Sequence, residues 1–184
     1  MTNDPDPTCP GPRHSVEIDL AEPCALWRPL LPDIDRLCAE AALAAIAGAE
    51  APLPGAAELS IVLGDDALVR SLNRQWRGRD APTNVLAFAA QEGETPDPSS
   101  PLPMLLGDVV LACETVTREA TSQGKPLADH LRHLVVHGVL HLLGYDHIDD
   151  DDAARMEALE TLILARLHVP DPYRERDTVE TADG

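Results

Sequence analysis

Residues 133–147, HLVVHGVLHLLGYDH, hold four of the chain's seven histidines and restrict how this segment can fold. Four residues advance an α-helix by about 400°, so His137 and His141 project from one helix face, one turn apart. A continuing helix would carry His147 to a different face. Gly144 lies between them, and glycine readily adopts the left-handed conformation that ends helices. The pattern therefore predicts a helix, a turn at Gly144, and a third histidine that returns towards the first two.

Three imidazoles with a fourth position open to water are typical of catalytic zinc sites, whereas structural sites usually close with four protein ligands. We therefore predict that His137, His141 and His147 bind one zinc ion per chain, although three imidazoles also suit nickel, copper or iron. His133 extends the same helix face by one turn. It would either contact the substrate or hydrogen-bond to the site, with plain packing as the alternative.

The residue after the first histidine of this pattern limits the chemistry. The spacing HxxxHxxGxxH is that of the metzincin metalloproteases, which carry a glutamate general base at that position. Here the position is Gly138. Phosphodiester hydrolysis depends more on charge stabilisation and positioning than on that glutamate, and a metal ion lowers the pKa of bound water to about 7. Gly138 therefore favours phosphodiester chemistry over proteolysis.

A second candidate feature is a group of four arginines, Arg70, Arg74, Arg77 and Arg79, with no acidic residue among them. The formal net charge of −18 argues against a general polyanion binder, because nucleic-acid surfaces normally need basic patches. Any such patch must be local, and this group is one. A guanidinium fork matches two phosphate oxygens. An ordinary solvated helix face is the alternative interpretation.

Hydropathy patterns along the rest of the chain predict four strands and five helices. Short apolar or alternating runs predict strands at 16–20, 58–64, 84–90 and 105–112. Helical periodicity predicts helices at about 29–48, 65–76, 114–123, 127–143 and 151–168. The segment 91–103, rich in Pro and Ser, is predicted to be a mobile loop between the last two strands. The aspartates at 149–152 are interpreted as favourable charges at a helix N-terminus, not as a cation site.

The length of 184 residues predicts a single domain. The polar ends, 1–14 and 174–184, are predicted to be disordered tails, which leaves 15–173 as the domain. Cysteines are widely spaced, no CxxC pair is present, and no signal-peptide pattern precedes them, so we expect free thiols in the cytoplasm. No apolar run approaches the roughly 18 residues of a membrane span, and no membrane partner is expected.

One segment carries a specific resemblance. HGVLHLLGYDH (137–147) resembles, over its full length, the HGxLHLxGYDH signature of the YbeY endoribonucleases. The similarity continues through LNRQWRGRDAPTNVLAF (72–88), LGDVVLA (106–112) and MEALETLIL (156–164), with Pro and Tyr at 172 and 173. It covers roughly residues 58–173.

The resemblance implies that His137, His141 and His147 are the zinc ligands and that Arg77 is the family's functionally important arginine. It also implies an α+β, zincin-like fold in which a small, mostly parallel four-stranded sheet carries the metal-bearing helix, with a cleft over the metal. The implied role is single-strand-specific RNA cleavage in small-subunit ribosomal RNA maturation and ribosome quality control. The implied partners are ribosomal RNA and the small ribosomal subunit, and DNA is not an expected substrate.

Two positions depart from the family's usual pattern: Asn84 stands where aspartate is usual, and Ala87 where serine is usual. We predict a zinc-dependent endoribonuclease in which Arg77 is catalytic and the substrate is bound by Arg74, Arg77, Arg79 and His133. Three alternatives remain at this stage: a zinc peptidase with another base, a non-catalytic ribosome-associated zinc protein, and a small-molecule metallohydrolase.

Overall fold

The computed structural model describes residues 15–49, 53, 55–90, 102–146 and 150–174. Its strands form one sheet in the order β1-β2-β4-β3. Their bounds are β1 Val16–Ala21, β2 Ala57–Gly64, β3 Val85–Ala89 and β4 Met104–Ala112. Strands β1, β2 and β4 run parallel, and β3 pairs antiparallel with β4 at the edge. The prediction of an α+β fold with a small, mostly parallel sheet is confirmed.

Six helices lie in the described part of the chain, one more than predicted. They are α1 Trp27–Leu30, α2 Ile34–Gly48, α3 Asp66–Arg77, α4 Cys113–Ser122, α5 Leu127–Leu142 and α6 Asp150–Arg166. The prediction of one helix over 29–48 was wrong, because the chain leaves the helical conformation at Leu31 (φ −136°, ψ 86°). Leu31 precedes Pro32, whose ring disfavours the helical conformation of the residue before it.

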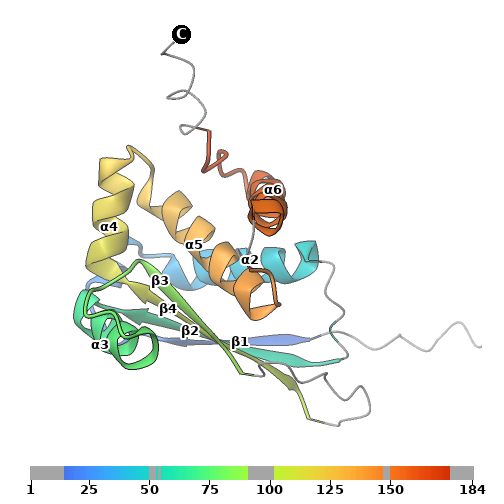
Figure 1. Cartoon of the computed structure of the whole chain (residues 1–184). Coiled ribbons are helices and arrows are strands. Elements are labelled where there is room, and N and C mark those ends of the chain that lie inside the picture. The colour runs from blue at the N-terminus through green and yellow to red at the C-terminus, as the bar shows by residue number, and fades with distance from the viewer. Residues whose placement is uncertain (1–14, 50–52, 54, 91–101, 147–149, 175–184) are drawn as a thin grey trace, which may run out of the picture.

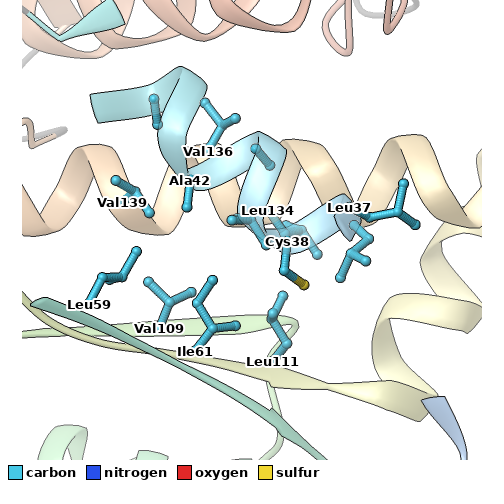
Figure 2. Close-up of a cluster of buried hydrophobic side chains, with 14 of the residues drawn as sticks. Leu37, Cys38, Ala42, Leu59, Ile61, Val109, Leu111, Leu134, Val136 and Val139 are labelled. Atoms are coloured by element: carbon cyan, nitrogen blue, oxygen red, sulfur yellow. The ribbon is translucent and has the colours of Figure 1, made fainter. Parts of the chain in front are cut away.

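The helices form layers on the two faces of the sheet (Figure 1). Helices α2 and α5 cover one face with α6 outside them, whereas α3 lies under the other face. Figure 2 shows the larger core, in which side chains of α2 and α5 meet those of β2 and β4. A smaller cluster joins Val69 of α3 to Leu86, Val110 and Ala112 of the sheet. Successive side chains of β3 therefore face α5 and α3 in turn, as strand geometry requires.

Two aspartates fix the start of α3. The Asp65 side chain caps the helix by accepting a hydrogen bond of 2.8 Å from the Leu68 amide. Asp66 accepts a hydrogen bond of 2.7 Å from the Thr115 hydroxyl, which joins the starts of α3 and α4. The helix ends at Gly78, which has a positive φ of 67°. These contacts place the last turn of α3, with Arg74 and Arg77, beside the edge strand β3.

Several predicted segments lie partly outside the described residues. The structure does not describe residues 91–101 of the predicted loop, the tail 1–14, residues 175–184 of the second tail, Asp149 or His147. Helix α6 begins at Asp150, with three aspartates in its first turn. Among the described residues, no helix is both long and apolar enough to cross a membrane.

Candidate metal centre and its cleft

Helix α5 brings His137 and His141 together at its C-terminal end. Their ring centroids are 4.6 Å apart, and their Nε2 atoms are separated by 3.1 Å. Both side chains are partly exposed, whereas the opposite face of the helix is buried against the sheet and α2. The predicted pairing of these two nitrogens on one helix face is thus present.

The helix ends at Leu142, and Gly144, two residues later, has a φ of 90°, which confirms the predicted left-handed turn. The Tyr145 amide donates to the Leu140 carbonyl at 3.1 Å and the Gly144 amide donates to the His141 carbonyl at 3.0 Å. This pair of bonds is a Schellman motif, which reverses the chain after a helix. The chain therefore turns back directly after His141. The third predicted ligand, His147, lies outside the described residues, and within those residues no group of three potential metal ligands is present.

Gly138 has a structural reason to be glycine. It is buried, and a Cβ atom built there would lie 2.8 Å from Cγ1 of Val109 on β4. Real Cβ atoms essentially never approach another heavy atom that closely. Position 138 therefore faces the sheet, and a glutamate side chain would not fit between α5 and β4. The contact with Val109 therefore leaves no room at position 138 for the glutamate base of the metzincins, which the sequence also lacks there.

A buried carboxylate that the sequence analysis did not single out holds the histidines. Glu160 of α6 has a relative exposure of 0% and accepts hydrogen bonds from His137 Nδ1 at 2.7 Å and from His133 Nε2 at 3.0 Å. The Tyr173 hydroxyl also donates to it. Because Nδ1 of His137 carries the proton that it donates to Glu160, the free lone pair of this ring is on Nε2, the atom that faces His141.

The charge state of Glu160 follows from these contacts. Burial alone would raise its pKa, but the hydrogen bonds from His133, His137 and the Tyr173 hydroxyl lower that pKa to about 2. Glu160 is therefore a carboxylate acceptor for the histidines. A signal for it existed in the sequence, because Glu160 falls in the buried stripe of α6 that Met156, Ile163 and Leu164 form.

His133 and Asn84 lie on one side of the histidine pair. Both line a hollow of about 420 Å³ together with His137 and Tyr173. The Asn84 amide donates to Glu119 Oε2 at 2.9 Å. Because Glu119 also accepts from buried His130 at 3.0 Å, an aspartate at position 84 would place a second carboxylate beside the first. The amide of Asn84 suits this neighbour.

Arg77 lies on the other side of the pair. It lines a cleft of about 270 Å³ together with His141, Gly144, Asp146 and Ala87. Ala87, the second departure from the family pattern, therefore presents a methyl group to this cleft instead of a hydroxyl. Arg77 is exposed at the end of α3, and as a lining residue of this cleft it lies near His141.

The other arginines of the group differ from one another. Arg70 makes a two-fold ion pair with Asp80, with donor to acceptor distances of 2.8 and 2.9 Å. Arg74 and Arg79 are exposed, and in the part of the chain that the structure describes neither has a carboxylate within ion-pair distance. Arg74, Arg77 and Arg79 therefore present exposed guanidinium groups, and of these Arg77 lines the cleft.

Comparison with known proteins decides the family. The family model described as "Endoribonuclease YbeY" matches residues 33–168. The chain belongs to the YbeY endoribonuclease family. This confirms the family predicted from the segment 137–147.

Individual YbeY relatives match over most of their length. The protein named endoribonuclease YbeY from Paramagnetospirillum magneticum is 56% identical over 163 residues, which cover 88% of this chain and 98% of the relative. The one from a Bradyrhizobium species is 46% identical and covers 92% of this chain and 98% of the relative. The solution structure of TM1509 from Thermotoga maritima has a TM-score of 0.52 at 22% identity and covers 92% of this chain and 96% of that one. It supports the fold alone.

Proposed function

We propose that this protein is a metal-dependent endoribonuclease that uses zinc and cleaves single-stranded RNA. Family membership supports the metal-dependent nuclease activity, since the relatives are named endoribonuclease YbeY. The observation that carries the proposal in this chain is the cleft that Arg77 shares with His141, one turn from His137. A pair of imidazoles beside a guanidinium is suited to holding an ion and a phosphate side by side.

The histidine pair fits zinc. Two imidazole nitrogens bound to one tetrahedral zinc ion at 2.0–2.1 Å lie about 3.3 Å apart. The Nε2 atoms of His137 and His141 are 3.1 Å apart, and Glu160 orients the first ring from behind. His137 and His141 would therefore supply two ligands, and we propose His147, three residues after the turn at Gly144, as the third. A bound zinc ion supplies Lewis acidity, which lowers the pKa of water and neutralises phosphate charge.

The chain's own groups then perform separate tasks. Arg77 binds the scissile phosphate and stabilises the charge that develops on its oxygens. Arg74 and Arg79 contact neighbouring phosphates of the strand. Glu160 keeps His137 in one tautomer, and His133, on the same carboxylate, borders the hollow in which the substrate would continue. Arg77 is the proposed catalytic residue, because it alone of the arginine group lines the cleft with His141.

We further propose that the RNA is the small-subunit ribosomal RNA and that the protein acts in its maturation and in ribosome quality control, in contact with the small subunit. We propose a cytoplasmic location and one metallohydrolase domain over 15–173. The three described cysteines, Cys24, Cys38 and Cys113, are buried free thiols, which suits a reducing compartment.

A substrate comparison tests this function. Zinc-loaded protein is expected to cut a single-stranded RNA, to leave the same sequence in a duplex largely intact, and to leave casein uncut. Gel analysis of labelled substrates measures all three. Cleavage of casein without cleavage of RNA would assign the protein to the peptidases instead.

Replacing Gly144 with Val is expected to weaken zinc binding. A β-branched residue at φ 90° is strained by about 1–2 kcal/mol, so the turn would shift and displace the segment that leads to His147. A competition titration with a chromogenic chelator measures the affinity. Gly124 provides a matched control, because it also has a positive φ (63°) in a helix-ending turn. Gly124→Val should cost similar stability and leave zinc affinity unchanged, and equal affinities for all three proteins would contradict the role of the Gly144 turn.

Replacing Glu160 with Gln is expected to lower zinc affinity about 10- to 100-fold, as is typical when the partner of a ligating histidine is lost. The amide cannot accept from all three donors that the carboxylate satisfies. The same competition titration measures the change, and thermal melting checks that the protein remains folded. Tyr173→Phe removes a single donor from Glu160 and should have a smaller effect. A folded Glu160→Gln protein with unchanged zinc affinity would show that Glu160 serves packing only.

A further inference from the structure

Helix α3 carries an apolar stripe that its core covers only in part. Val69 and Asn73 form the buried face of this helix. Leu68, Leu72 and Trp76, spaced four residues apart, line a hollow of about 870 Å³ on the face of the sheet opposite α5. Leu68 and Leu72 also pack against the smaller core cluster, and the core leaves Trp76 mostly exposed. Trp76 is 66% exposed, although a side chain of this size normally finds cover in the core. The stripe therefore ends in an aromatic ring that is open to a ligand.

The indole of Trp76 makes a ring contact with Phe88. Its ring centroid is 6.2 Å from that of Phe88 on β3, and the two planes are inclined by 59°. Aromatic pairs at this separation and inclination attract one another. Phe88 is itself partly buried against the smaller core cluster. The contact thus supports the indole from the side of β3 and leaves most of its surface exposed.

This hollow adjoins the cleft that contains His141. Arg77, Ala87 and Ala89 line both of them, so the two meet along the edge strand β3. The aromatic ring precedes Arg77 by one residue, and the exposed guanidinium groups of Arg74 and Arg79 flank it in sequence. The lining of the hollow is mostly apolar, with Arg77 and the exposed carboxylate of Asp108 as its charged residues. An apolar surface beside guanidinium groups suits a ligand that is flat and apolar on its faces and carries negative charge along its backbone. A single-stranded nucleic acid has this chemistry.

We propose that Trp76 is a stacking platform for an unpaired base of the RNA, next to the phosphate that Arg77 binds. The inference rests on the proposed function and deepens it. Every base has a π-face, so stacking tolerates any sequence. A base in a duplex already stacks on its neighbours and would have to leave them to reach the indole. Trp76 therefore contributes to selection of single strands, while Arg77 acts at the scissile phosphate.

Binding of a short 2′-O-methyl RNA to the zinc-loaded protein tests the proposal, with the integrity of the oligonucleotide checked on a gel. Trp27 is fully buried, so a change in intrinsic fluorescence on binding reports on Trp76. We expect quenching on binding, and Trp76→Ala should weaken binding roughly 5- to 150-fold, the range for loss of one stacked base. Trp76→Phe should retain most of the affinity. The matched control is Leu43→Ala, because Leu43 is also an exposed apolar residue but lies on a different helix, α2. This variant should bind the RNA as tightly as the parent does.

A second oligonucleotide gives an independent readout. An RNA in which all bases are replaced by abasic sites keeps its phosphates, so the parent and Trp76→Ala should bind it equally. Equal affinity of the two proteins for the normal RNA, without quenching, would overturn the stacking site while leaving the nuclease function intact. If the parent dimerises through this face and Trp76→Ala is monomeric in sedimentation, the surface is a contact between copies and the proposal is wrong. Failure of the parent to bind any RNA would overturn the proposed function itself.

Discussion

His141→Ala is expected to reduce bound zinc from about one ion per chain to nearly none and to abolish RNA cleavage. Two remaining imidazoles make a weak site, because zinc in proteins usually has at least three protein ligands. The Nε2 atom of His141 lies 3.1 Å from that of His137, so its loss removes one side of the candidate site. Metal analysis of the purified variant, beside the cleavage assay, measures both effects.

A histidine outside the site provides the control for this variant. His168 lies beyond α6 with a φ of 58°, a conformation that asparagine tolerates. His168→Asn should therefore keep both zinc and activity. The His141→Ala protein should remain folded, since His141 is partly exposed at the end of α5. If loss of zinc instead unfolds the chain, the ion is structural, as in the alternative of a non-catalytic ribosome-associated protein. Full zinc retention would exclude His141 as a ligand.

Arg77→Ala is expected to lower the rate of RNA cleavage about 10²- to 10³-fold, the usual cost of removing one donor that stabilises transition-state charge. Zinc content and thermal stability should not change, because Arg77 is exposed and, within the described residues, makes no ion pair. Arg77→Lys should recover part of the activity. It keeps the charge and loses the planar fork that contacts two phosphate oxygens at once.

The order of the three proteins carries the conclusion. A cleavage rate that falls from the parent to Arg77→Lys and again to Arg77→Ala indicates a phosphate clamp. Equal rates for the parent and Arg77→Lys indicate a general positive field. Arg166 in the last turn of α6 is the matched control, since Arg77 occupies the last turn of α3. Arg166→Ala should cleave RNA as the parent does. An Arg77→Ala protein with parental activity would remove Arg77 from the reaction.

Local features of this fold were predictable from the sequence because local rules determine them. The spacing of His137, His141 and Gly144 predicted a helix that ends in a left-handed turn, and the φ of 90° at Gly144 agrees. The helix predicted at about 65–76 begins at Asp66, as the periodicity of its apolar residues indicated. The error at Leu31 has a local cause as well, because the proline after it outweighed the helical periodicity on both sides.

Contacts between distant segments were not predictable in this way. Glu160 meets His133 and Tyr173, which lie 27 and 13 residues away, and no spacing rule relates them. Arg77 reaches the cleft of His141 because the strand order 1-2-4-3 places β3 at the edge, where both α3 and α5 contact it. The sequence shows that glycine occupies position 138, where the metzincin pattern has its glutamate. Only the packing of Val109 against it explains why none would fit.

We propose that RNA cleavage requires an ion held by the α5 histidines beside Arg77. Titration of the metal-free protein with zinc, followed by the rate of cleavage of a single-stranded RNA, tests this requirement. We expect no cleavage before zinc is added, a linear rise in rate, and a plateau at about one equivalent per chain, as a single three-histidine site requires. Full cleavage by folded, metal-free protein would show that no ion is required, and a rate that stays at background after saturation with zinc would show that zinc does not support cleavage.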